Sequence, residues 1–447
     1  MENNIKPPKN SNYAATIVEI KTLVPLEKCD FVQAAIIMGN QVIVSKDIKI
    51  GDIGLYFPLE CQLSHEYVSN NNLYRKKDLN VDKEKAGYFE ENRRIRCVKF
   101  RGHKSEGLFM PLSSLDFITN ISLNVGTELD ELNNIEICRK YIIQHYQSNP
   151  TSKIGKKNRI KKKVSKLVDN QFRFHQDTNM LYKNLHMIKP ESLISITYKL
   201  HGTSGISSRV LCKKHISKID KFKEWIWNLT YFIPNLFKST PDQFILDETE
   251  YDYLYSSRKV IKNEELNPNT KHYYNEDIWK LADEQIKPFL QKGMSAYYEI
   301  VGYVPGGAMI QKGYDYGCEP STFKVYIYRL TYTNPDGKLF EFSAKQVQDF
   351  CKKNGLNAVP QLFYGFAKDF SDERMTEENW QNKLLETLKA KYNEKDCFMC
   401  YNKVPEEGIV IRVEGLDFEA YKLKSNAFYE WETKQLDIGE VDIESEN

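Results

Sequence analysis

The stretch that decides the fold is Thr197-Tyr198-Lys199-Leu200-His201-Gly202-Thr203-Ser204-Gly205. The run from Ile194 to Thr197 is rich in β-branched residues, which indicates a strand that leads into this lysine. A loop of small residues follows it. Taken alone, the pattern is common, and a surface lysine before a turn explains it equally well. The interpretation of Lys199 therefore depends on the rest of the chain.

Further short motifs follow Lys199, each on or beside a predicted strand. They are Glu299-Ile300-Val301-Gly302, Phe323-Lys324-Val325-Tyr326-Ile327-Tyr328, Glu407-Gly408-Ile409-Val410-Ile411-Arg412 and Tyr421-Lys422-Leu423-Lys424. Each motif is weak by itself, because short combinations of these residues arise by chance. Their occurrence in this order makes the set specific.

This ordered series resembles the covalent nucleotidyltransferase superfamily of polynucleotide ligases and mRNA capping enzymes, and Lys199–Ser204 is similar to the RNA ligase version. Other stretches resemble one clade of ATP-dependent RNA ligases with an N-terminal OB module: Gly51–Pro58, Gly87–Phe89, Arg93–Arg101, Gly107–Leu108 and Phe174–Thr178. DNA ligases and capping enzymes carry an OB domain after the last motif. Only Ser425–Asn447 follow it here, so we expect the RNA ligase arrangement.

The implied fold class is α+β, with an N-terminal OB-like β-barrel followed by an antiparallel-sheet ligase-type nucleotidyltransferase domain. Short strand-like runs separated by turns before residue 115 agree with a small barrel. We predict an OB-like domain over 1–120, a basic linker over 121–170, an adenylyltransferase domain over 171–432 and an acidic tail over 433–447. Helices are predicted over Glu276–Lys292, over Thr376–Tyr392 and from a Ser343 cap toward Gly355.

The resemblance implies covalent catalysis in three steps. Lys199 attacks the α-phosphorus of ATP, which releases pyrophosphate and leaves a lysyl–AMP. AMP then moves to an RNA 5′-phosphate, and a 3′-hydroxyl finally displaces it. An amine is nucleophilic only when deprotonated, so the pKa of Lys199 must fall from the ordinary lysine value of about 10.4. Desolvation and neighbouring cations or metal have that effect.

The resemblance also assigns the other site residues. Nucleotide contacts are expected from Thr197, Gly202, Arg258, Glu299, Tyr326, Val410, Lys422 and Lys424. In this set Glu299 holds the ribose hydroxyls, and Tyr326 stacks on adenine, with Tyr328 as the alternative. Glu407 organises the metal, Mg²⁺ or Mn²⁺. His201 and Ser204 are candidates for the later steps on RNA, and Arg258 stands behind an insertion over 213–250.

The implied substrates are ATP and RNA ends. We expect the ends to meet at a nick in duplex RNA or an RNA/DNA hybrid, with RNA on the 3′-OH side. A monomer without a membrane partner is expected. Two alternatives stay open: a GTP-dependent mRNA guanylyltransferase, and a non-catalytic RNA-binding protein with a ligase-like fold.

Composition narrows the class of protein. The 447 residues carry 63 Lys and Arg against 61 Asp and Glu, a net charge of +2, which excludes a wholly basic nucleic-acid coat. No apolar run approaches the roughly 20 residues of a membrane span, and no signal peptide is expected. Nine scattered cysteines favour a reducing intracellular compartment, cytoplasm or nucleus.

Four features allow two interpretations each. The predicted strand Arg93–Phe100, with basic Arg94, Arg96, Lys99 and Arg101, presents either a solvated face or a nucleic-acid groove. The basic run Lys153–Lys166 is either an exposed linker or a phosphate contact. The aromatic segment Lys223–Phe232 either packs on the core or meets a partner or membrane surface. Cys397 and Cys400 are either buried thiols or a zinc or redox pair.

Overall fold

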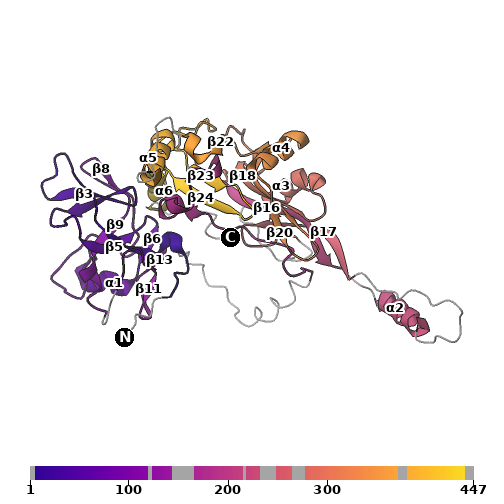
Figure 1. The fold of residues 1–447 in the computed structure, drawn as a ribbon, viewed down its shortest axis with the longest axis horizontal. Coiled ribbons are helices and arrows are strands. Elements are labelled where there is room, and N and C mark those ends of the chain that lie inside the picture. Colours follow the sequence, from indigo (N-terminus) through magenta and orange to yellow (C-terminus); the bar gives the residue numbers. More distant parts are fainter. Residues whose placement is uncertain are drawn as a thin grey trace.

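The computed structural model describes residues 6–118, 123–142, 166–214, 218–231, 248–263, 277–370 and 380–437. Residues 6–142 form an N-terminal domain built mainly of strands, and residues from 166 onward form a larger C-terminal domain beside it (Figure 1). The C-terminal domain combines long strands with helices, as the predicted α+β class requires.

Antiparallel strands build the N-terminal domain. β1 pairs with β5 and β10, β5 pairs with β9, and β2, β3 and β4 form a meander. Smaller pairs join β6 to β13, β7 to β8 and β11 to β12. The bounds are Ala15–Glu19 (β1), Leu23–Pro25 (β2), Val32–Ile37 (β3), Asn40–Ser45 (β4), Ile53–Phe57 (β5), Cys61–Leu63 (β6), His65–Asn70 (α1), Val98–Phe100 (β7), His103–Ser105 (β8), Leu108–Pro111 (β9), Glu128–Leu129 (β10), Glu131–Leu132 (β11), Ile135–Glu136 (β12) and Cys138–Lys140 (β13). Apolar side chains such as Ile17, Leu55 and Phe57 are fully buried in its core.

Two largely antiparallel sheets frame the C-terminal domain. The first has the order β17-β16-β18-β19-β20, with β21 parallel to β19, and the second has the order β14-β24-β23-β15-β22. The first contains Thr203–Lys213 (β16), Thr249–Ser257 (β17), Met294–Gly302 (β18), Phe323–Thr333 (β19), Leu339–Glu341 (β20) and Asn357–Ala358 (β21). The second contains Asn179–Met180 (β14), Leu193–Tyr198 (β15), Gln361–Phe366 (β22), Gly408–Val413 (β23) and Glu419–Lys424 (β24).

Helices cover the outer faces of these sheets. α3 (Ile278–Ile286) buries Trp279 in the core of the first sheet, and α5 (Trp380–Tyr392) packs Leu384 against the second. α4 (Ala344–Asn354) begins at a Ser343 capping box and ends at Gly355, whose φ of 67° is left-handed, as predicted. The three predicted helices therefore all form: α3 ends at Ile286, before the predicted Lys292, and α5 ends at the predicted Tyr392. Residues 376–379 of the α5 prediction lie outside the described residues.

The chain passes from one sheet to the other at Lys199–Gly202. β15 ends at Tyr198 in the second sheet, and β16 begins at Thr203 in the first. The intervening residues are therefore held at both ends by hydrogen-bonded strands. This crossover places Lys199 at the end of β15, between the two sheets.

The final helix, α6 (Asn426–Asp437), lies at the junction of the two domains (Figure 1). It includes Thr433–Asp437, so the acidic tail predicted from residue 433 begins inside a helix. Ion pairs also join the two domains. Lys183 Nζ of the C-terminal domain lies 2.9 Å from Glu128 of the N-terminal domain, and Lys389 Nζ lies 3.3 Å from Glu106.

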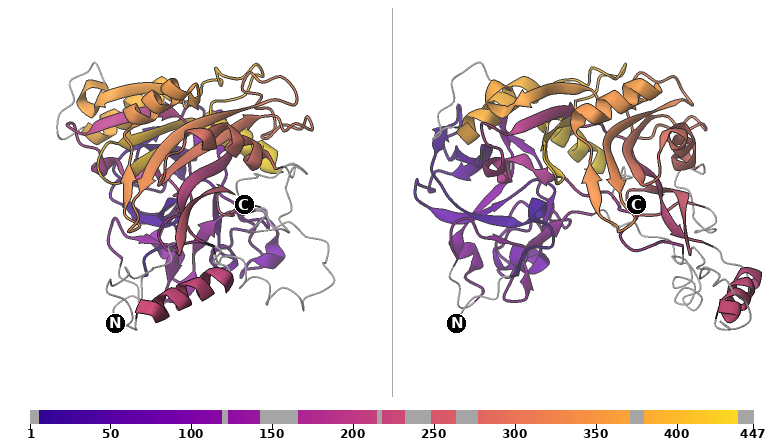
Figure 2. Two further views of the ribbon diagram at one scale, coloured as in Figure 1. Left: turned by 90° about the vertical axis from the view of Figure 1, so that its right-hand side faces the viewer. Right: turned by 45° about the vertical axis from the view of Figure 1, so that its right-hand side comes forward.

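The helix in the insertion, α2 (Lys218–Tyr231), projects away from the rest of the C-terminal domain (Figures 1 and 2). Its Phe222 and Trp225 rings stack at 5.9 Å, yet the two residues are 59% and 58% exposed. Such an aromatic pattern more commonly packs on the core. That interpretation is wrong for the described side chains of this segment, because they are largely exposed.

The predicted strand over Arg93–Phe100 is also mostly wrong. Only Val98–Phe100 forms a strand, and Ile95 follows an irregular path with its backbone hydrogen-bonded to Cys61.

The basic residues Lys153–Lys163 lie outside the described residues. None of the described helices is long and apolar enough to span a membrane.

Candidate active site

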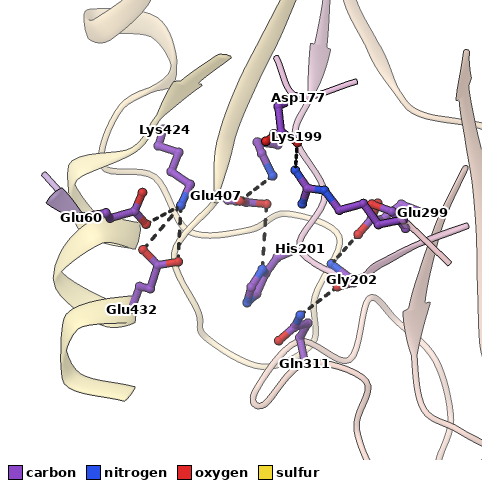
Figure 3. Close-up of polar contacts among 12 residues, drawn as sticks. Glu60, Asp177, Lys199, His201, Gly202, Glu299, Gln311, Glu407, Lys424 and Glu432 are labelled. Atoms are coloured by element: carbon purple, nitrogen blue, oxygen red, sulfur yellow. Dashed lines mark hydrogen bonds and ion pairs between the residues drawn. The ribbon is translucent and has the colours of Figure 1, made fainter. Parts of the chain in front are cut away.

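Lys199 holds its amine beside a buried carboxylate (Figure 3). Its backbone N–H donates to the Gly408 carbonyl at 2.8 Å, which ties the end of β15 to the start of β23. Its Nζ donates to Glu407 Oε1 at 2.6 Å, and the Glu407 side chain is only 4% exposed. The structure thus brings together the predicted nucleophile and the predicted metal ligand, although the two lie 208 positions apart.

Glu299, near the end of β18, is fixed by the residues that follow Lys199. Its Oε1 accepts a hydrogen bond from the Gly202 N–H at 3.1 Å, and its Oε2 accepts one from Ser204 Oγ at 3.0 Å. Gln311 Nε2 donates to the Gly202 carbonyl at 2.8 Å. Because both carboxylate oxygens have donors, Glu299 is held in one orientation at the wall of the cavity.

His201 is enclosed by aromatic rings. Its ring lies edge-on to Tyr314 and Phe428, each with centroids 4.9 Å away, and 5.8 Å from Trp431. Its backbone N–H donates to Tyr316 Oη at 2.6 Å, and its Nδ1 lies 4.0 Å from Glu407 Oε2. The side chain therefore has a defined direction toward Glu407 (Figure 3).

Thr197, Val410 and Lys422 form a row across the second sheet. Thr197 is the register partner of Val410 between β15 and β23, and Val410 is the partner of Lys422 between β23 and β24. All three line one cavity, together with Lys199, Glu299 and Glu407. Sheet pairing therefore converts three separate motifs into one continuous surface.

The two lysines of the last motif differ in their surroundings. Burial, followed by the positive charges of Lys424 and Lys199, lowers the pKa of Lys422 to about 8. Burial also opposes the charge of Lys424, but Glu432 and Glu60 outweigh it and raise the pKa of Lys424 well above its ordinary value. Lys424 Nζ lies 2.8 Å from Glu60 and 3.3 Å from Glu432 (Figure 3).

Arg258 reaches the cavity despite the long insertion before it. β16 and β17 pair antiparallel, with Gly205 opposite Ser257, so the chain returns to the crossover just before Arg258. The Arg258 guanidinium forms an ion pair with Asp177. Burial would raise the pKa of Asp177, but Arg258 outweighs it and lowers that pKa.

The cavity lining favours Tyr328 over Tyr326 as the aromatic residue of β19 at the site. Tyr328 lines the cavity, and its Oη lies 2.9 Å from His175 Nδ1. Tyr326, preferred from the sequence, is not among the lining residues, although both tyrosines pack against the cluster around Leu200. The two tyrosines share one face of the strand, so sequence spacing alone does not separate them.

The N-terminal domain completes the cavity with residues that sequence reasoning missed. Tyr13, Glu60, Arg94 and Lys140 all line it. Tyr13, Glu60 and Lys140 lie at positions where the sequence analysis found no motif. Only Arg94 had a signal, as part of the basic stretch.

The basic face of the N-terminal domain is largely covered by the C-terminal helix. Arg94 and Arg96 each lie 3.1 Å from Asp437, and Lys99 lies 2.8 Å from Glu430. Arg94 is itself buried. Carboxylates of α6 thus pair with all three basic side chains, yet the Lys99 side chain remains 50% exposed. The choice between a solvated face and a nucleic-acid groove stays a prediction.

The carboxylates at the cavity suit a hard divalent cation. Mg²⁺ is often held by only one or two carboxylates, with water and substrate phosphates as its other ligands. Glu407 and Glu299 supply such oxygen atoms at the cavity wall. The described residues contain no cluster of three or more His, Cys, Asp or Glu side chains that could hold a metal, the Cys397–Cys400 region included.

Comparisons with known proteins support the fold. A family model described as an OB-fold domain matches residues 14–112, which confirms the predicted N-terminal OB fold. A search of curated proteins finds no match.

Most of the chain is similar in fold to solved RNA ligase structures from Naegleria gruberi. A point mutant with ATP and Mn is 14% identical with a TM-score of 0.56, covering 93% of this chain and 98% of that one. An apo mutant is 15% identical with a TM-score of 0.56, covering 95% and 99%. The ligase with PPi is 15% identical with a TM-score of 0.53, covering 94% and 98%. At this level of identity the likeness concerns the fold, and the predicted α+β fold with an N-terminal OB-like domain is confirmed.

We predict that Gly202→Ala disrupts the crossover. A Cβ at Gly202 would collide with the Ile300 carbonyl and come within 2.8 Å of Val301 Cγ1. Overpacking of this kind costs about 1–3 kcal/mol of unfolding free energy, measurable by thermal or chemical denaturation. Gly415→Ala is the matched control, because a Cβ there meets nothing within 4 Å. Equal stability of the two variants would contradict the close approach of Gly202 to β18.

Proposed function

We propose that this protein is an ATP-dependent RNA ligase that joins 3′-OH and 5′-phosphate ends through lysyl–AMP and adenylated RNA intermediates. The observation that carries the proposal is one cavity that contains the Lys199 amine, the Glu299 and Glu407 carboxylates and the lysines of the last motif. The comparison structures support it, because they are named as RNA ligases and include complexes with ATP and Mn.

In the first step the Lys199 nitrogen forms a bond to the α-phosphorus of ATP, and the bond to pyrophosphate breaks. Lys199 must first lose its proton, for which Glu407 Oε1 at 2.6 Å is the neighbouring acceptor. The positive charge of Lys422 nearby favours that loss. Lys422 lies where its ammonium can offset negative charge on the phosphate. Arg258 is a second cation for this purpose once a phosphate competes with Asp177.

The nucleoside end of ATP is assigned to the part of the cavity lined by Glu299 and Tyr328 of the first sheet and Val410 of the second. Glu299, held by Gly202 and Ser204, presents carboxylate oxygens to the ribose hydroxyls. Tyr328 and Val410 line the same cavity and supply apolar surface for adenine. Glu407 would hold Mg²⁺ or Mn²⁺, which supplies charge neutralisation on the phosphates when bound.

The later steps transfer AMP to the RNA 5′-phosphate, with cleavage of the P–N bond, and then release AMP when the 3′-hydroxyl attacks. His201 and Ser204 lie directly after the nucleophile and beside Glu407 and Glu299, so they are placed to act on the RNA end. The arginine and lysine side chains of the N-terminal domain at the cavity suit an RNA phosphate.

The nucleophile is tested by intact mass after incubation with ATP and a divalent cation. Wild type should gain one AMP, and Lys199→Ala should gain none, because its side chain has no amine. Lys352→Ala, an exposed lysine on α4, is the control and should gain AMP normally. A GTP adduct without an ATP adduct would indicate a guanylyltransferase, and no adduct with either nucleotide would favour a non-catalytic RNA-binding protein.

The substrate is tested by comparing a nicked duplex with free single strands. A nick holds the two ends together, so we expect sealing at least about tenfold faster than joining of free strands. A gel assay should use an RNA strand on the 3′-OH side, paired to either RNA or DNA. Faster joining of free ends, or equal sealing of an all-DNA nick, would contradict the expected substrate.

A further inference from the structure

Lys424 is enclosed by groups from three parts of the chain. It lies at the end of β24, and its Nζ donates to Glu60 of the N-terminal domain at 2.8 Å and to Glu432 of α6 at 3.3 Å. The Phe428 and Tyr429 rings lie 5.2 and 5.3 Å from the same nitrogen. The Lys424 side chain is only 10% exposed. Two carboxylates thus balance one ammonium inside the domain junction (Figure 3).

The backbone at Glu60 is held in an uncommon conformation. Its φ of 62° lies in the left-handed region, which a non-glycine residue adopts only when its surroundings enforce it. The Glu60 N–H donates to the Ile95 carbonyl at 3.1 Å, and the Glu60 carbonyl accepts from the Tyr141 N–H at 2.9 Å. These bonds aim the side chain out of the N-terminal domain and toward Lys424.

The ion pair between Glu60 and Lys424 also affects Lys422, which is the neighbouring cation. Among the described residues no carboxylate lies at ion-pair distance from Lys422, whereas Lys424 has two. The charges that act on Lys422 are those of Lys424 and Lys199, which disfavour its ammonium, and those of Glu60 and Asp177, which favour it. Glu60 therefore acts on Lys422 both directly and by holding Lys424.

We propose that Glu60 is a positioning residue for the proposed adenylylation. It fixes Lys424 and so leaves Lys422 as the lysine that meets the phosphates. The nucleotide site therefore depends on how the N-terminal domain is positioned against the C-terminal domain. This inference rests on the proposed ligase function. Glu60 need not touch the nucleotide, because its effect passes through the two lysines.

The chain offers a matched control for domain docking. Glu128 of the N-terminal domain also pairs with a lysine of the C-terminal domain, Lys183, at 2.9 Å. That lysine is 3% exposed, and neither residue lines the cavity. Glu128→Gln therefore weakens the same kind of contact between domains without changing the charge at the nucleotide site.

The experiment measures the rate of lysyl–AMP formation against ATP concentration and pH in Glu60→Gln and Glu128→Gln. We expect Glu60→Gln to lower the maximal rate about tenfold, and Glu128→Gln to stay within about twofold of wild type. Without the Glu60 charge the pKa of Lys422 falls below its value of about 8. The loss of rate at alkaline pH should then begin at lower pH in Glu60→Gln alone.

Thermal denaturation shows whether each variant is folded, and Glu432→Gln replaces Glu60→Gln if the latter does not fold. An unchanged rate and pH profile in the folded variant would overturn the positioning role. The same conclusion would follow if Glu60→Gln and Glu128→Gln lost rate equally, since docking alone would then explain the loss. Absence of any adduct in wild type would instead reject the proposed function and this inference together.

Discussion

The close approach of Gly202 to β18 is the constraint on which the site depends. The chain leaves one sheet at Tyr198 and enters the other at Thr203, so Lys199–Gly202 must bridge them. Gly202 has no Cβ, which lets its backbone lie against Ile300 and donate to Glu299. A single short segment therefore fixes the position of the nucleophile relative to the carboxylate of the opposite sheet.

The second constraint is charge. Burial disfavours isolated charges, so the lysines of the cavity must be compensated within it. Glu407 pairs with Lys199, while Glu60 and Glu432 pair with Lys424. The positive charge of Lys422 is balanced least, because burial and the neighbouring Lys424 and Lys199 lower its pKa to about 8. A bound anionic phosphate would supply the balancing negative charge. The electrostatics of the cavity thus suit a negatively charged ligand.

The sequence predicted those helices and strands whose formation depends mainly on residues close together in the chain. The Ser343 cap, the helix it begins and the strands that carry the motifs follow from side-chain hydrogen bonding and β propensity. The features that the sequence did not predict depend on contacts between residues far apart in the chain. Glu60 and Arg94 have roles only because α6 meets the N-terminal domain, and α2 projects although its aromatic residues resemble a core-facing pattern. Tyr326 and Tyr328 differ only in how far along one strand the cavity extends.

α6 explains how these parts act together. It follows β24 directly, and the Ser425 N–H that precedes it donates to the Glu407 carbonyl at 2.9 Å. Phe428 packs against the His201 ring, Glu432 binds Lys424, and Asp437 binds Arg94. Successive turns of one helix therefore contact the candidate for the RNA steps, the nucleotide site and the N-terminal domain. The N-terminal domain is therefore linked through this helix to the surroundings of both His201 and Lys424.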